Sequence, residues 1–238
     1  MSTRLKQTFQ NRMAEWSFAS KKEYVDPFNE VEVSGVFVHP DGSEKAVPAF
    51  WAGGNVWRVR YASQDVGRHK FHIVCSDESN EELNSQRGIL EVTRYMGKNP
   101  LFVHGPIRVS QDRRYLEHAD GTPFFWLGDT WWMGLTTRLN WPRDFKKLAT
   151  DRAKKGFTLV QIVAGLYSDM PPFDQRGANE AGFPWEEGFS RINPEYFGFM
   201  DRRIDWLVEE GIVPCIVGAW GYYCLLYTSD AADEEDSV

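Results

Sequence analysis

The sequence predicts a two-domain protein in which a small β-sandwich precedes an α/β domain with parallel strands. Two observations support this prediction. Up to about residue 96, short segments of alternating apolar and polar residues are separated by turn residues. After about residue 120, apolar segments alternate with segments of helical periodicity. Since the pattern changes near residues 94–100, we expect domains over residues 1–96 and 97–223 with a linker between them.

Short strands fill the first domain. Residues 30–38 alternate with the period of two that a half-buried strand requires. A turn follows at residues 40–42, where Pro fixes φ and Gly accepts a positive φ. The polar residues 76–86 are expected to form an exposed loop. Further strands of the same kind are predicted over residues 45–51, 56–61, 69–75 and 89–93.

Three apolar segments of the second domain predict strands that are buried on both faces. They cover residues 123–129, 158–163 and 212–217, and a hairpin over residues 107–118 precedes them. The first of the three is expected to end at Asp129. It is followed by tryptophans and not by a glycine-rich phosphate loop, which argues against nucleotide binding.

Amphipathic helices connect these strands. Asn140 and Pro142 suit the start of the first helix, and Gly156 suits its end. In the second helix, the Asn-Pro pair at residues 193–194 suits the start and Gly211 suits the end. The order strand-helix-strand-helix-strand with short turns specifies parallel strands and right-handed crossovers. A barrel and an open, doubly wound sheet both fit this order.

Composition excludes several classes of function. The chain has 238 residues, 42% hydrophobic and 26% charged, as in ordinary globular proteins. A net charge of −7 does not indicate the basic surface typical of proteins that bind nucleic acid. No apolar run approaches the ~20 residues of a membrane helix, and residues 1–7 lack the apolar region of a signal peptide, so we expect a cytoplasmic protein. Three scattered cysteines give neither a disulfide framework nor a zinc signature, so no metal or cofactor is expected.

The last fifteen residues, 224–238, differ from the rest of the chain. They hold five acidic residues and no Lys or Arg, so the remaining chain is close to neutral. Residues 224–234 resemble the in-frame translation of a transposase sequencing adapter. We therefore expect this tail not to be native sequence and the native sequence to continue differently after Tyr223. The alternative is an acidic, disordered C-terminus.

Several motifs of the chain occur in an order typical of one family of enzymes. In the second domain they are DGTPFFWLGDTWW at residues 120–132, GFTLVQ at 156–161, NPEYF at 193–197 with Asp201, and EGIVP at 210–214 leading to Trp220. In the first domain they are residues 26–28, 40–42 and 57–60. The chain thereby resembles the apiosidase-like (β/α)8 glycoside hydrolases, which carry a small N-terminal domain of unknown function.

The resemblance implies an all-β immunoglobulin-like sandwich followed by a truncated (β/α)8 TIM barrel of about three βα units. It also implies hydrolysis of O-glycosidic bonds by two carboxylates, either with retention or with inversion. In such barrels the acid/base follows the fourth strand and its partner follows the seventh, whereas this chain reaches the third. The expected carboxylates therefore lie beyond Tyr223, and no catalytic residue is assigned. We expect the chain by itself to be inactive.

The strand ends supply candidate contacts to a carbohydrate. A carboxylate at Asp129 can accept hydrogen bonds from sugar hydroxyls, and flat aromatic rings can stack on sugar faces. The alternative explanations are a capped turn for Asp129, packing for the aromatic rings and a satisfied buried amide for Gln161. The candidate substrate-binding residues are Asp129, Trp131, Trp132, Gln161, Tyr167, Trp220 and Tyr222.

Two other functions fit the same residues. A carbohydrate-binding protein without catalytic activity would use the sandwich as its recognition module. An unrelated α/β enzyme would carry the three strands in an open sheet. Neither nucleic acid nor a membrane is an expected partner.

Overall fold

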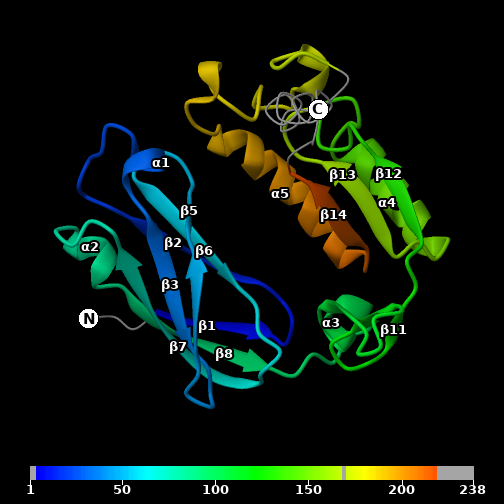
Figure 1. Cartoon of the computed structure of the whole chain (residues 1–238), viewed down its shortest axis with the longest axis horizontal. Coiled ribbons are helices and arrows are strands. Elements are labelled where there is room, and N and C mark those ends of the chain that lie inside the picture. Colours follow the sequence, from blue (N-terminus) through cyan, green and yellow to red (C-terminus); the bar gives the residue numbers. More distant parts are fainter. Residues whose placement is uncertain (1–3, 168–169, 219–238) are drawn as a thin grey trace, which may run out of the picture. The chain divides into compact units, whose positions relative to one another are not determined.

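The computed structural model describes residues 4–167 and 170–218 of the chain. The chain divides into two compact units, Met1–Phe124 and Phe125–Val238 (Figure 1). Residues 97–124 are grouped with the first unit. The domain boundary expected from the sequence, between residues 96 and 97, stays a prediction.

The first unit is built mainly from two β-sheets. The larger one has the order β1-β8-β7-β3-β4, in which the pair β1 and β8 is parallel and the other pairs are antiparallel. Its strands are β1 (Arg4–Phe9), β3 (Val33–Val38), β4 (Glu44–Pro48), β7 (Gly67–Cys75) and β8 (Arg87–Thr93). The smaller, antiparallel sheet has the order β2-β6-β5, with β2 (Ala14–Ala19), β5 (Phe50–Trp51) and β6 (Val56–Tyr61).

Alternating side chains of both sheets meet in one hydrophobic core. In β6 every second residue is buried, and Tyr61 stacks on Phe37 of β3 with ring centroids 3.9 Å apart. The ring centroids of Trp16 in β2 and Phe71 in β7 lie 4.8 Å apart. Because fully burying one large apolar side chain contributes about 1.5–3 kcal/mol, these aromatic contacts hold the two sheets together.

Two predictions for the first unit are wrong. Residues 45–51 do not form one strand, because β4 ends at Pro48 and β5 pairs with the other sheet. Residues 76–86 are not a purely exposed loop, because they contain helix α2 (Glu81–Asn84), whose Leu83 is fully buried. Strands β1 and β2 were not predicted at all.

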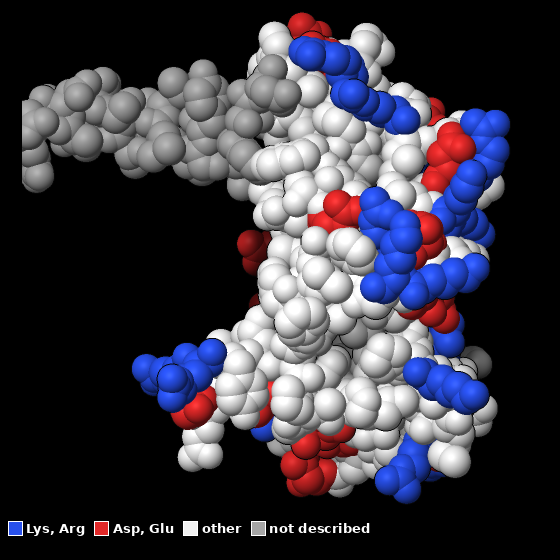
Figure 2. All heavy atoms as spheres, turned by 90° about the vertical axis from the view of Figure 1, so that its right-hand side faces the viewer, with Lys and Arg blue, Asp and Glu red and all other residues white. Residues whose placement is uncertain are grey.

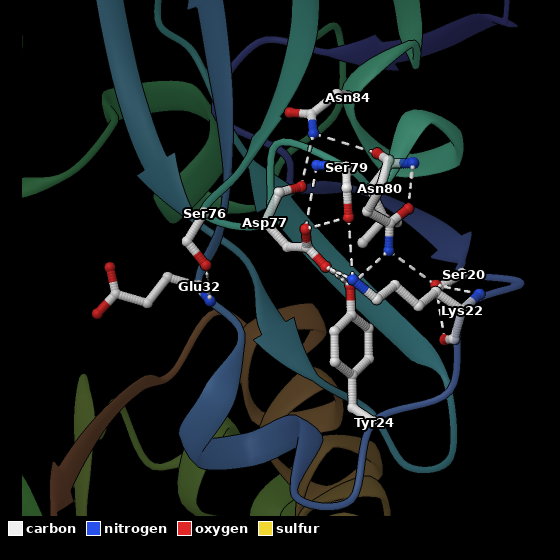
Figure 3. A network of polar contacts seen from close by, with 10 residues as sticks. Ser20, Lys22, Tyr24, Glu32, Ser76, Asp77, Ser79, Asn80 and Asn84 are labelled. Carbon is white, nitrogen blue, oxygen red and sulfur yellow. Dashed lines mark hydrogen bonds and ion pairs between the residues drawn. The ribbon is translucent and has the colours of Figure 1, made fainter.

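A network of polar contacts fixes the segment that contains α2 (Figure 3). The Asp77 carboxylate accepts hydrogen bonds from Lys22, from Ser79 and from the Tyr24 hydroxyl, the last at 2.8 Å. These donors hold the pKa of Asp77 well below its usual range. Asn80 is almost fully buried; it caps α2 through the main-chain N–H of Leu83 and donates to the Tyr24 hydroxyl. The network thus ties α2 to the residues that follow β2.

Short elements complete the first unit. The hairpin predicted over residues 107–118 is confirmed, and it is extended by a third strand. The elements are α1 (Pro27–Glu30), α3 (Pro100–His104), β9 (Ile107–Val109), β10 (Leu116–His118) and β11 (Pro123–Phe124).

The second unit contains a parallel sheet with helices between its strands. The order of the sheet is β12-β13-β14, with both pairs parallel, so the predicted strand-helix-strand-helix-strand arrangement is confirmed. Its elements are β12 (Gly128–Trp131), α4 (Arg143–Lys154), β13 (Leu159–Val163), α5 (Pro194–Glu209) and β14 (Val213–Val217), with short 3-10 turns at Gln175–Gly177 and Glu187–Phe189.

The ends of these elements differ in part from the prediction. The segment 123–129 is not one strand, because β11 belongs to the antiparallel hairpin and β12 begins only at Gly128. The side chain of Asn140 does not cap α4, where Pro142 holds the cap position without a side-chain hydrogen bond. The Asn193 side chain does cap α5 by accepting from the main-chain N–H of Glu195.

Helices α4 and α5 pack on one face of the parallel sheet (Figure 1). Val160 and Ile162 of β13 share a core with Phe145 of α4 and Leu207 of α5. No closed barrel is formed by residues 125–167 and 170–218. The structure is therefore a mostly β protein of several sheets with few helices, and the truncated barrel is not confirmed.

Surface features bear on possible partners. Within the described part of the chain, no helix is both long and apolar enough to cross a membrane. On the face drawn in Figure 2, basic side chains are interspersed with acidic ones.

Candidate functional site

A cavity of about 700 Å³ lies where β12 and β13 end. We call it the aromatic cavity, because Trp131, Trp132 and Tyr167 line it. Trp131 is the last residue of β12, Trp132 is the next, and Tyr167 lies four residues beyond the end of β13. Three of the predicted substrate contacts are thus brought together. Its other lining residues include Met133, Met170, Arg138 and Arg176.

The three rings differ in how much surface they present. Trp131 is 7% exposed and packs edge-on against Phe145 of α4 at 5.5 Å. Tyr167 is 4% exposed, and its hydroxyl donates to the carbonyl of Val163. Trp132 is 45% exposed, so it is the ring of this group with the most surface for a ligand. Trp131 and Tyr167 form the walls beside it.

Asp129 lies inside β12, which continues to Trp131, and the expectation that the strand ends at Asp129 is wrong. One carboxylate oxygen accepts from Arg152 Nε of α4 at 2.5 Å and from Trp131 Nε1 at 2.9 Å. The other accepts from the main-chain N–H of Thr130. Burial raises the pKa of Asp129, but the hydrogen bonds from Trp131 and Arg152 outweigh it, so the pKa lies below its ordinary value. Asp129 does not line the aromatic cavity.

Gln161, the second polar candidate, lies away from the aromatic cavity. It is half-buried in β13 between Val160 and Ile162, which face the helices, so its side chain points to the opposite face of the sheet. It does not line the aromatic cavity.

The other sequence-based expectations concern the end of the chain, where residues 219–238 lie outside the described residues. Two of the predicted substrate contacts, Trp220 and Tyr222, are among them. Tyr223, beyond which we expect the catalytic carboxylates, also lies outside the described residues, as does the tail over residues 224–238. The two aromatic contacts, the place of the carboxylates beyond Tyr223 and the foreign origin of the tail therefore stay predictions.

Two arginines line the aromatic cavity without any sequence motif that predicts them there. Arg176 binds Asp174 through both carboxylate oxygens, at 2.9 and 2.7 Å, which lowers the pKa of Asp174 to about 2. Arg138 is exposed and forms no ion pair within the described part of the chain. No pattern marked either residue, because most arginines in a sequence are solvated surface residues.

The loop that carries Tyr167 and Arg176 is fastened to α5. Arg203, fully buried, donates to Glu180 of this loop at 2.8 Å. Asn179 donates to the main-chain carbonyl of Tyr196 at 2.9 Å, and burial raises the pKa of Tyr196 to about 12. This wall of the aromatic cavity is therefore held in place by buried contacts.

Charged groups around the site show no arrangement suited to a metal ion. In residues 4–167 and 170–218, no cluster of three or more His, Cys, Asp or Glu side chains is placed to bind one. Among the described residues that line the aromatic cavity, none is Asp or Glu. The described lining residues therefore include aromatic and cationic groups but no carboxylate.

Comparison with known proteins places the second unit in a family. Residues 110–235, more than half of the chain, match the model of the apiosidase-like catalytic domain. The chain belongs to the apiosidase-like family. Residues 8–76 match a domain of unknown function (DUF5060). The comparison with curated proteins gave no match.

A solved structure shares the fold of this chain. A protein of Bacteroides vulgatus assigned to the glycoside hydrolases has a TM-score of 0.68 and 23% identity over 91% of this chain, which shows a shared fold. The apiosidase-like chain spans 43% of the length of that protein. A glycoside hydrolase of family 5 from the same organism is 26% identical over 53% of this chain and 27% of its own length, with a TM-score of 0.42.

Proposed function

We propose that this chain is part of a glycoside hydrolase that cleaves O-glycosidic bonds in an oligosaccharide or polysaccharide. The aromatic cavity at the ends of β12 and β13 supports this proposal most directly. Barrel enzymes bind their substrates at the carboxyl ends of their parallel strands, and exposed aromatic rings there suit the flat faces of sugars. Trp132 is the proposed stacking ring, with Trp131 and Tyr167 beside it.

The proposal includes the domain organisation expected from the sequence. In this proposal, residues 1–96 form an immunoglobulin-like sandwich domain. Residues 97–223 form the first part of a barrel domain, whose βα units are β12 with α4 and β13 with α5. A role for Asp129 in binding sugar hydroxyls stays a prediction, since both of its oxygens already accept hydrogen bonds within the protein. Gln161, on the helix-free face, is the second polar candidate.

Hydrolysis requires two carboxylates that flank the glycosidic bond. Since no described Asp or Glu lines the aromatic cavity, we infer that this chain binds sugar without hydrolysing it. In the whole protein the two carboxylates would come from sequence beyond Tyr223. The second candidate function is a carbohydrate-binding protein without catalysis that uses the sandwich as its recognition module. The two candidates differ in the whole protein, which would hydrolyse its glycan only in the first case.

Two assays test the proposal. Saturation-transfer NMR with a panel of neutral and acidic oligosaccharides tests for binding, and a reducing-sugar assay with the same panel tests for cleavage. We expect binding by this chain and no cleavage. Cleavage by this chain would contradict the inference that it binds sugar without hydrolysing it. The absence of any binding would contradict the carbohydrate site.

A further inference from the structure

Among the described residues, the charged side chains that line the aromatic cavity have one sign. Its charged lining residues among those described are Arg138 and Arg176, and both are cationic. The charge of Arg176 is balanced by Asp174. Asp129, in strand β12 of the sheet, is paired with Arg152. Arg138 therefore contributes a positive charge that no described side chain neutralises.

The position of Arg138 is fixed by its neighbours. Its main-chain N–H donates to the hydroxyl of Thr136, which is fully buried and itself donates to the carbonyl of Met133. The main-chain N–H of Thr137 donates to the carbonyl of Ala178 on the opposite loop. The backbone that carries Arg138 is thus held between the two loops that form the aromatic cavity. Less ordering is then needed when a ligand binds.

We infer that the aromatic cavity binds a sugar that carries an anionic substituent, and that Arg138 pairs with this substituent. The inference rests on the proposed carbohydrate site and adds the charge of its ligand. A guanidinium offers two parallel N–H donors that match a carboxylate or a sulfate group. The ring of Trp132 stacks on the same sugar, so that its apolar face and its anionic group are bound together.

Ligands that differ mainly in their charge separate the effect of the anionic group on binding from the effect of the sugar ring. The probes are methyl β-D-glucopyranoside, the corresponding glucuronide, the methyl ester of the glucuronide and glucose 6-sulfate, with the galacto and manno series beside them. Binding to the full chain is measured by saturation-transfer NMR and by titration. We expect at least one uronate or sulfate to bind about tenfold tighter than its neutral partner, a difference that shrinks as salt is raised. The uronate and sulfate arms show which anionic group is preferred.

Variants of two arginines identify the residue responsible. R138Q should reduce the preference for the anionic sugar to less than about twofold, while R138K should keep part of it. R143Q removes an exposed arginine that is paired with Asp144 and does not line the aromatic cavity, and it should leave the preference unchanged. Circular dichroism of each variant verifies that it is folded.

The outcomes distinguish this inference from the function on which it rests. If neutral and anionic sugars bind equally well, the anionic ligand is refuted while the carbohydrate site stands. A preference that survives in R138Q refutes the role of Arg138. If no sugar of any series binds, both the inference and the carbohydrate site are refuted.

Discussion

Arg152 of α4 donates a hydrogen bond to the carboxylate of Asp129 in β12 and links the first helix of the second unit to its first strand. Side chains of both residues are about three-quarters buried, at 25% and 27% exposed. Trp131 donates to the same oxygen from the neighbouring position of the strand. The carboxylate that resembles a ligand-binding group in the sequence thus has a structural role in the fold.

Asp129→Asn should destabilise the chain by about 1–2 kcal/mol at pH 7, because it removes a partly buried, charge-assisted hydrogen bond. Urea unfolding measures the difference. The folded-state pKa of Asp129 is depressed, so its contribution is present above the unfolded pKa of about 4 and is lost as the pH falls through the folded value. The difference between wild type and variant should therefore shrink below about pH 4. Asp144→Asn, at an exposed pair, should change little.

Arg203→Met should destabilise the chain by about 3 kcal/mol. It removes a fully buried guanidinium and leaves Glu180, whose side chain is 31% exposed, without its partner. The matched control is Arg202→Met, at an exposed position of the same helix, which should cost less than about 1 kcal/mol. Urea unfolding of both variants measures the difference, and equal effects would show that the Arg203–Glu180 pair does not stabilise the loop.

Asn80→Ala should cost about 2 kcal/mol, since it deletes the cap of α2 and leaves the Tyr24 hydroxyl without one of its donors (Figure 3). Thermal unfolding of the full chain reports the loss. Asn29→Ala, at an exposed position of α1, is the control and should have little effect. An unchanged unfolding temperature for Asn80→Ala would mean that the network in Figure 3 contributes no stability.

Residues that begin and end helices made the order of elements in the second unit predictable from sequence. Asn193 caps α5, and Gly156 and Gly211 follow the helices with positive φ, so the strand-helix order could be found from local chemistry. The break between β11 and β12 could not be found in this way, because residues 125–127 are as apolar as the strands beside them. Only the pairing partners, which lie far apart in sequence, separate the two strands.

The candidate site was predictable only in part. Aromatic residues at a strand end predicted Trp131, Trp132 and Tyr167, which do line one cavity. The side to which Asp129 points could not be predicted, since the apolar segment that precedes it does not alternate between polar and apolar residues. The expected burial of this strand on both faces is wrong, because two of the four residues of β12 are exposed. Its partner Arg152 lies on a helix 23 residues away. Arg138 carries no motif, and only the cavity identifies it.

The proposed carbohydrate site requires that the aromatic cavity binds a sugar ring on Trp132. The most direct test is a saturation-transfer NMR titration of the full chain, of Trp132→Ala and of Trp126→Ala with the oligosaccharide that binds best in the panel. Trp126 is 55% exposed and does not line the aromatic cavity, so it is a matched control. We expect Trp132→Ala to weaken binding at least tenfold, because one stacked ring is lost, and Trp126→Ala to bind like the wild type. Equal binding by Trp132→Ala and the wild type would contradict the claim.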